Sequence, residues 1–232
     1  MSSPSGAKAA VPVITIDGPS GSGKGTISRR VAALLDWHLL DSGALYRLVA
    51  LAGRQASLDL ADEAGHAAAA ARMAVTFGQT GAGDERVLLA GEDVTAAIRT
   101  EEAGQGASRV AAWAGVRDAL LQRQRDFAQP PGLVADGRDM GTVVFPSAAL
   151  KIFLTASPGE RARRRYNQLK DKGSGASLAA LSLEIAERDR RDSTRAVAPL
   201  LPAAEAMTID STSLTIDEVV QKIMAEVRAR RI

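Results

Sequence analysis

The chain has 232 residues, of which 46% are hydrophobic, so it is long enough to bury a substantial core in one domain. A formal net charge of +2 does not by itself indicate a nucleic-acid partner. The absence of cysteine excludes disulfides and thiolate chemistry, and with two histidines it argues against zinc. No apolar run approaches the roughly 20 residues needed to span a bilayer, so we expect a cytoplasmic protein without a membrane partner.

Residues 1–10 are mostly small or polar, and we expect them to form a disordered tail. The remainder, residues 11–232, shows no internal repeat and no linker long enough to separate independent domains. We therefore predict a single domain over this range.

A glycine-rich segment follows the first apolar run, residues 11–16, and precedes a helical pattern. Its glycines let backbone N–H groups close around an anion, and the helix start turns its positive dipole end toward the same point. Strand, loop, lysine and helix in this order predict an ATP-binding phosphate loop, in which Thr26 stands one place beyond the usual hydroxyl position. The predicted loop consists of Gly18, Pro19, Ser20, Gly21, Ser22, Gly23, Lys24, Gly25 and Thr26.

A second short strand is predicted over residues 37–40. Ligands collect beyond the carboxyl ends of parallel strands, so Asp41 and Ser42 are expected to share a crevice with the phosphate loop. Arg47 lies on a helix predicted over 44–55, where it faces either the same crevice or solvent. We expect His38, within the apolar run, to be structural rather than catalytic.

The middle of the chain interrupts the alternation of strands and helices. Short antiparallel strands are predicted near 74–77, 86–89 and 91–94, with a turn over 78–84. Helices are predicted from Asp62 to residue 72, around Glu101, and over 108–127.

Apolar strands are predicted again over 133–136, 150–155 and 206–210. Asp136, at the end of the first, is a candidate for holding magnesium-bound water or the loop lysine, although an acid after an apolar run is a common pattern. Ser157-Pro158-Gly159-Glu160 is typical of a helix start, and residues 215–218 form a capping box for the terminal helix.

Two groups of arginines lie at 161–165 and 188–195, on either side of a predicted break at 170–175. Arginines on a closing lid would exclude water from a phosphoryl transfer and neutralise the moving group. Alternatively, the two arginine groups form solvated helix faces. We favour the lid, because the same chain contains a phosphate loop.

Four motifs occur in the order shown by one family. Residues 16–26, 40–47, 136–146 and 187–200 resemble the bacterial cytidylate kinases, and the similarity extends over about residues 11–228. The resemblance implies an α/β fold: a P-loop three-layer, doubly wound parallel sheet with a monophosphate-binding insertion at about 60–107, which contains short antiparallel strands, and a helical lid at about 157–176. It also implies ATP-dependent phosphorylation of CMP and dCMP to CDP and dCDP by direct in-line transfer.

The same resemblance implies a role for each matching residue. Ser108, Arg117 and Asp139 would read cytosine, and Arg188 and Asp192 would hold the sugar. Arg47, Arg138 and Arg195 would grip the acceptor phosphate, and Ser42 would also contact CMP. Mg²⁺ would be held by the ATP phosphates, with Thr26 and Asp136 as indirect contacts. Stabilisation of the transferring group is expected from Lys24, Arg138, Arg161 and Arg165.

The cytosine assignment has a physical basis at Asp139. A carboxylate accepts a hydrogen bond from the exocyclic amine of cytosine, whereas uracil presents an oxygen at that position and would be repelled. Because the acceptor phosphate oxygen is itself the nucleophile, no protein nucleophile or dedicated base is required.

Two other functions remain open from the residues alone. Another phosphate-loop kinase, acting on UMP, AMP or an alcohol, would share the donor site. A nucleotide-dependent switch or nucleic-acid binder would use the basic helices, but the chain has no Asn-Lys-x-Asp motif, and aromatic residues at 3% provide few stacking platforms. We expect a monomer that binds ATP and CMP or dCMP and no nucleic acid.

Overall fold

The structure is a computed structural model that describes residues 11–79, 85–171 and 177–232. The expected tail, residues 80–84 of the predicted turn and residues 172–175 of the predicted break lie outside the described residues. Within the described ranges, no helix combines the length and the apolar character needed to cross a bilayer.

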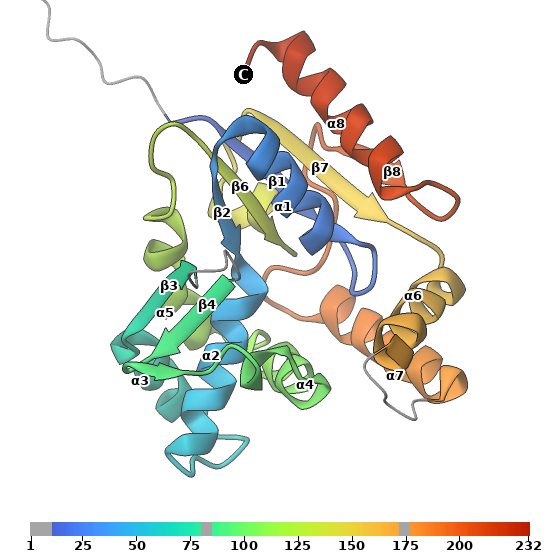
Figure 1. The fold of residues 1–232 in the computed structure, drawn as a ribbon. Helices are drawn as coiled ribbons and strands as arrows, with labels where there is room; N and C mark the ends of the chain where they lie inside the picture. The colour runs from blue at the N-terminus through green and yellow to red at the C-terminus, as the bar shows by residue number, and fades with distance from the viewer. Residues whose placement is uncertain (1–10, 80–84, 172–176) are drawn as a thin grey trace, which may run out of the picture.

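The core is a parallel sheet of five strands in the order β2-β6-β1-β7-β8 (Figure 1). All residues of the central strand β1 are buried, as expected for a strand covered on both faces. The register sets Asp17, at the end of β1, beside Gly137 and Phe153 of its neighbours, so several strands end at one edge. The strands are β1 (Val13–Asp17), β2 (His38–Asp41), β6 (Leu133–Gly137), β7 (Leu150–Thr155) and β8 (Met207–Asp210).

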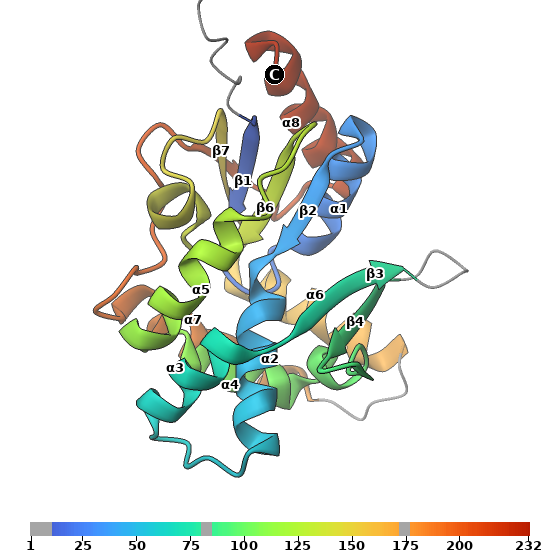
Figure 2. The ribbon, with the colours of Figure 1, turned by 90° about the vertical axis from the view of Figure 1, so that its left-hand side faces the viewer.

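Helices cover the two faces of this sheet. Helices α1 (Lys24–Leu35) and α8 (Ile216–Arg230) lie together on one face, seen at the right of the sheet in Figure 2, where Ile27 and Ile223 join the core around Ile14. Helices α2 (Ser42–Gln55) and α5 (Ala114–Arg125) contribute to a second core around Leu45 and Leu120. The predicted three-layer α/β fold is confirmed.

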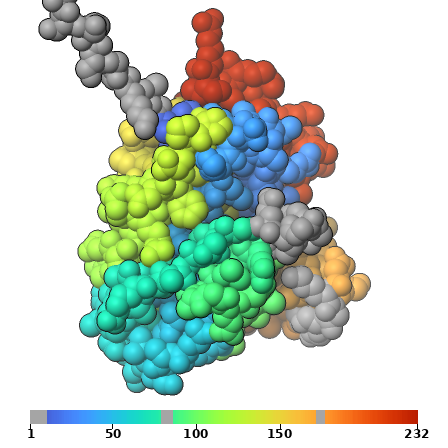
Figure 3. All heavy atoms as spheres, turned by 60° about the vertical axis from the view of Figure 1, so that its left-hand side comes forward, coloured from blue at the N-terminus to red at the C-terminus, as the bar shows by residue number. Residues whose placement is uncertain are grey.

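The predicted antiparallel strands form a separate small sheet in the order β3-β4-β5. It lies in the part coloured teal to green at the centre of the lower half of Figure 3. We call residues 60–107 the insertion. The elements of this part of the chain are α3 (Glu63–Arg72), β3 (Val75–Gln79), β4 (Glu85–Leu89), β5 (Glu92–Asp93), η1 (Ala97–Arg99) and α4 (Glu101–Val110).

One helix boundary was predicted wrongly. The two helices expected in this region are present, but the boundary between them is shifted: the helix around Glu101 extends to Val110, and the helix predicted from 108 begins only at Ala114. The turn between them allows α4 to pack on α2 while α5 packs on α3. Trp113, at this turn, adopts an extended backbone and packs its ring against His66. No proline marks this break, and Gly115 lies just beyond it, where its N–H donates to Glu63 of α3.

Two helices, α6 (Pro158–Asp171) and α7 (Leu178–Thr194), lie beyond the carboxyl edge of the sheet (Figure 1). The predicted start of α6 is confirmed, since the Ser157 hydroxyl accepts the N–H of Glu160 at 3.3 Å. The capping box of α8 is also present, between Thr215 and Glu218. His38 is exposed, and its Nε2 lies 2.9 Å from the Pro130 carbonyl oxygen, a contact that fits the expected structural role.

Candidate active site

A cleft of about 2080 Å³ opens where the carboxyl edge of the sheet meets the insertion and the helices α6 and α7. The phosphate loop, the start of α2 and the end of β6 contribute to its walls. Segments distant in the sequence are therefore brought to one site, as the predicted parallel sheet requires.

The phosphate loop has the backbone that its glycines were expected to allow. Gly18 has φ +153°, and a Cβ there would lie only 1.9 Å from the Leu154 carbonyl oxygen. Gly21 and Gly23 also have positive φ, and Gly23 is the N-cap of α1. The loop therefore ends at the positive end of α1, an arrangement suited to phosphate oxygens.

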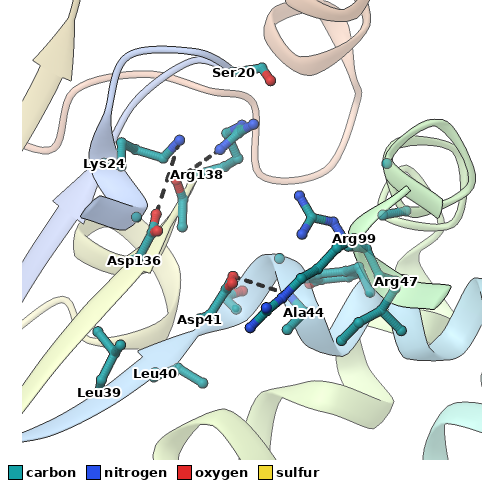
Figure 4. A pocket seen from close by; sticks show the side chains of 18 of the residues that line it. Ser20, Lys24, Leu39, Leu40, Asp41, Ala44, Arg47, Arg99, Asp136 and Arg138 are labelled. Atoms are coloured by element: carbon teal, nitrogen blue, oxygen red, sulfur yellow. Dashed lines mark hydrogen bonds and ion pairs between the residues drawn. The ribbon is translucent and has the colours of Figure 1, made fainter. Parts of the chain in front are cut away.

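Lys24 is buried at the first position of α1, and its Nζ donates to the Pro19 carbonyl oxygen at 3.1 Å. The same atom lies 4.0 Å from Oδ1 of Asp136, as Figure 4 shows. Burial, reinforced by the positive charge of Arg138, lowers the pKa of Lys24. Burial raises the pKa of Asp136, against the opposing effect of Lys24. A bound phosphate anion would favour the charged form of the lysine.

Several arginines in the cleft present unpaired nitrogens. Within the described part of the chain, Arg47 Nε, Arg188 Nε and Arg195 Nη2 are buried and have no hydrogen-bond partner. Burial, with the nearby charge of Arg138, lowers the pKa of Arg188 to about 10. Buried donors that lack a partner are costly, and an anion with several acceptor oxygens would satisfy them. This cluster is the strongest indication of an anion-binding site beside the phosphate loop.

Asp192 connects Arg138 with Ser108. Its Oδ2 accepts from Arg138 Nε at 3.0 Å, while its Oδ1 lies 3.4 Å from the Ser108 hydroxyl, which also accepts from Arg191 at 3.1 Å. Although burial acts in the opposite direction, the charges of Arg138 and Arg188 lower the pKa of Asp192. Ser108 thus contacts the carboxylate that is expected to hold the sugar, and it lines the same cleft as Arg117 and Asp139.

Arg117 and Asp139 form a buried ion pair, in which Arg117 Nη2 donates to Asp139 Oδ2. The exposed fraction is 2% for Asp139, so water screens this pair little. The Arg117 guanidinium also lies 5.7 Å from the centroid of the Tyr46 ring. Nearby, the Ser42 hydroxyl donates to Oε1 of the buried Gln124 at 2.7 Å.

The arginines of α6 have different partners. Arg161 donates to the Ser20 carbonyl oxygen at 3.1 Å and pairs with Asp189 of α7, and Arg164 donates to the Ser22 carbonyl oxygen at 3.2 Å. Arg165 instead reaches Glu101 in the insertion. Arg161 and Arg164 therefore contact the phosphate loop, whereas Arg165, which is one turn beyond Arg161, connects the lid with the insertion.

Several residues at this site had no assigned role at the level of the sequence. Asp17 is buried and accepts backbone N–H groups beside Asp139, Gln124 fixes Ser42, and Asp189 holds Arg161. Asp17 could have been noticed, because it ends an apolar strand directly before the phosphate loop. Gln124 has no such signal, since a glutamine in a helix pattern is usually solvated.

The phosphate loop on a parallel sheet, with a cationic cluster across the same cleft, defines a P-loop phosphotransferase. The family model described as cytidylate kinase matches residues 14–229. A cytidylate kinase of Pseudomonas fluorescens (strain Pf-5) is 61% identical over 95% of this chain and 97% of its own length. One of Azotobacter vinelandii is 59% identical over 94% and 96%. The chain belongs to the cytidylate kinase family and is a transferase.

Solved structures of other kinases resemble the chain more distantly. A shikimate kinase of Acinetobacter baumannii is 17% identical, with a TM-score of 0.44 over 96% of each chain. A thymidylate kinase of Candida albicans is 14% identical, with a TM-score of 0.42 over 97% of this chain and 94% of its own. The fold class rests on the strand order of the sheet and not on these similarities.

Proposed function

We propose that the enzyme transfers the γ-phosphoryl group of ATP to the phosphate of CMP or dCMP and forms CDP or dCDP. The observation that carries this proposal is the buried Arg117–Asp139 pair in the same cleft as the three unpartnered arginine nitrogens. Such an arrangement suits a ligand that has a phosphate at one end and a polar base edge at the other.

The donor side is proposed to be the phosphate loop, residues 18–26. Its backbone amides and the start of α1 would hold the ATP phosphates. Lys24 would stabilise the negative charge that develops on the leaving oxygen during transfer. Phosphoryl transfer needs mainly positioning and charge neutralisation, and the acceptor phosphate oxygen attacks the γ-phosphorus directly. We therefore assign no general base to the protein.

The acceptor phosphate is proposed to bind Arg47, Arg138 and Arg195, two of which have the unpartnered nitrogens described above. Arg188 and Asp192 would hold the sugar. Ser108 lies within hydrogen-bond distance of Asp192 and would support that side of the ligand as well as the base. Ser42 is proposed to contact CMP at the start of α2, held by Gln124.

Cytosine is proposed to lie against the Arg117–Asp139 pair. Asp139 would accept from the exocyclic amine, while Arg117 donates to the ring acceptors on the same edge. Uracil would place an oxygen against the carboxylate of Asp139. A buried charge that faces the wrong group lowers the rate with that substrate by about 10³ to 10⁵, more than a difference in shape would give.

Kinases of this family use ATP with a divalent metal ion, which we propose to be Mg²⁺. The residues present fit such an ion, because Asp136 and Thr26 carry oxygen donors and both line the cleft beside the phosphate loop. Oxygen donors of this kind are what Mg²⁺ prefers, and it usually retains several waters. The ion would neutralise phosphate charge, with Thr26 and Asp136 as indirect contacts.

The chain is proposed to divide into a core, the insertion as the monophosphate-binding part, and a lid at residues 157–176. In the lid, Arg161 and Arg165 are the proposed stabilisers of the transferring group, and Arg164 is a further candidate because it contacts the loop. Since the residues proposed for the site all come from one chain, we propose an active monomer, which sedimentation at assay concentration would test.

The test is a coupled assay of ADP formation from Mg-ATP with CMP, dCMP, UMP, AMP and no acceptor. Turnover with CMP and dCMP well above the other acceptors is expected. Equal, slow ADP release in all reactions, including the one without acceptor, would contradict the acceptor assignment while leaving the phosphate loop in place.

A further inference from the structure

A buried carboxylate connects the start of the phosphate loop with the segment proposed to read the base. Asp17, at the end of β1, is 3% exposed. Its Oδ1 accepts the backbone N–H of Met140 and its Oδ2 accepts that of Gly141, each at 2.8 Å. Both oxygens of one side chain are therefore committed to two consecutive amides more than a hundred residues away.

These amides directly follow Arg138 and Asp139. Asp17 pairs with Gly137 across the ladder between β1 and β6, so the chain leaves β6 and turns over the end of β1 at this point. The turn continues into the short π-helix η2 (Met140–Val144). The carboxylate is thus bound to the first amides beyond the two proposed acceptor-site residues, and it fixes the direction in which the turn begins.

Gly141 shows how closely this turn approaches β1. A Cβ on Gly141 would lie 2.9 Å from Thr15 Oγ1 and 3.4 Å from Asp17 Oδ2. A side chain there would meet the Thr15 hydroxyl and the Ala203 methyl group, 3.3 Å away, so that either these side chains or the turn would have to shift. A methyl group at this position is therefore expected to disturb the contact between Asp17 and the amides.

We propose that Asp17 is a positioning residue for the acceptor: its carboxylate holds the amides of Met140 and Gly141 and thereby presents Arg138 and Asp139 to bound CMP. This inference rests on the proposed function, because it assigns Asp17 an effect on the base and phosphate of the acceptor. Asp17 itself would touch neither substrate.

Two observations favour a positioning role over simple core packing. Burial raises the pKa of Asp17 to about 7, so the fold retains an ionisable group where a neutral side chain would be easier to bury. The backbone of Asp17 is itself paired on both sides, with Gly137 and Phe153. Backbone pairing therefore holds the start of the phosphate loop even without the carboxylate. Loss of the Asp17 carboxylate should weaken the binding of CMP more than the binding of ATP.

The test compares Asp17→Asn with the wild type. An amide has the same shape, but its oxygen accepts only one of the two N–H groups and its NH₂ faces the other. At pH 8, where the Asp17 carboxyl is mostly ionised, the KM for CMP is expected to rise about tenfold or more, since a charge-assisted bond to a buried donor is lost. The ratio of kcat/KM for CMP over UMP should fall, while the KM for ATP stays within about twofold.

Gly141→Ala provides a second variant that retains the carboxylate. It should give the same pattern, because it moves the same amides away from Asp17. Where Asp17→Asn fails to give a cooperative melting transition, Gly141→Ala decides the question. The matched control is Asp210→Asn, which alters an exposed aspartate at the end of β8 that accepts the Thr212 N–H at 2.9 Å. Its CMP kinetics should equal those of the wild type.

An unchanged KM for CMP and an unchanged CMP/UMP ratio in Asp17→Asn, with the wild type active on CMP, would overturn the inference. So would equal losses for ATP and CMP that follow the drop in melting temperature. A wild-type enzyme that is inactive with CMP in the same assay would instead contradict the proposed function.

Discussion

Arg165 of helix α6 donates two hydrogen bonds to one carboxylate oxygen of Glu101, at 3.0 and 2.5 Å. Glu101 begins helix α4 of the insertion, so the pair joins the two parts that are proposed to close over the substrates. Through this contact the lid reaches the acceptor side.

Glu101→Gln should weaken this connection. Because the two side chains are 30% and 35% exposed, the pair contributes at most about 1 kcal/mol, and we expect KM values to rise about two- to fivefold with little change in melting temperature. Steady-state kinetics at low and high salt would measure this. Glu102→Gln is the matched control, since Glu102 pairs with Arg54 instead; equal effects of the two variants would contradict the assignment.

Asp139→Ala should abolish the preference for CMP over UMP. The carboxylate is the proposed partner of the cytosine amine, and its removal takes away the repulsion of uracil. Arg117 loses its buried partner as well, so we expect a destabilisation of about 3 kcal/mol. The CMP/UMP ratio of kcat/KM is the measurement, with Asp118→Ala on the exposed face of α5 as control. An unchanged ratio would rule out this role for Asp139.

Lys24→Ala should lower kcat by a few hundredfold or more. Loss of one preorganised charge on the transferring group costs about 3 kcal/mol of transition-state stabilisation. Rapid-quench or coupled assays at saturating ATP and CMP would measure the loss. Lys222→Ala, an exposed lysine on α8, should retain wild-type turnover. Near-normal activity of Lys24→Ala would mean that the lysine does not act on the phosphates.

Asp17 should make stability depend on pH. Burial raises its pKa from 3.8 to about 7, with Asp139 and Asp136 adding to the rise and the amides of Met140 and Gly141 opposing it. The folded state therefore holds a proton that the unfolded state releases above pH 4. The resulting stabilisation, at most about 4 kcal/mol, is complete below pH 4 and is lost as the pH rises through 7.

Urea unfolding of the wild type and of Asp17→Asn across this pH range would test that prediction. As the pH rises from 4 to 7, the free energy of unfolding of the wild type should fall relative to that of Asp17→Asn. A difference that stays constant would show that Asp17 does not titrate in this range.

Local sequence patterns determined the elements whose hydrogen bonds are made within a few residues. The glycines of the phosphate loop are needed for backbone angles that a Cβ would obstruct, and Ser157 and Thr215 cap helices through amides three positions away. The apolar strands were also evident, because a strand covered on both faces is apolar throughout. From these features the fold class and the phosphate loop could be predicted.

The tertiary structure decided which side chains meet across long stretches of chain. Ser108 contacts Asp192, which is 84 residues away in the sequence, and Arg165 pairs with Glu101 while Arg161 contacts the phosphate loop. The sequence places each of these residues on a helix but does not set how the helices cross. Those crossings follow from the packing of whole faces, which no local pattern specifies, and they decide which charges become neighbours in the cleft.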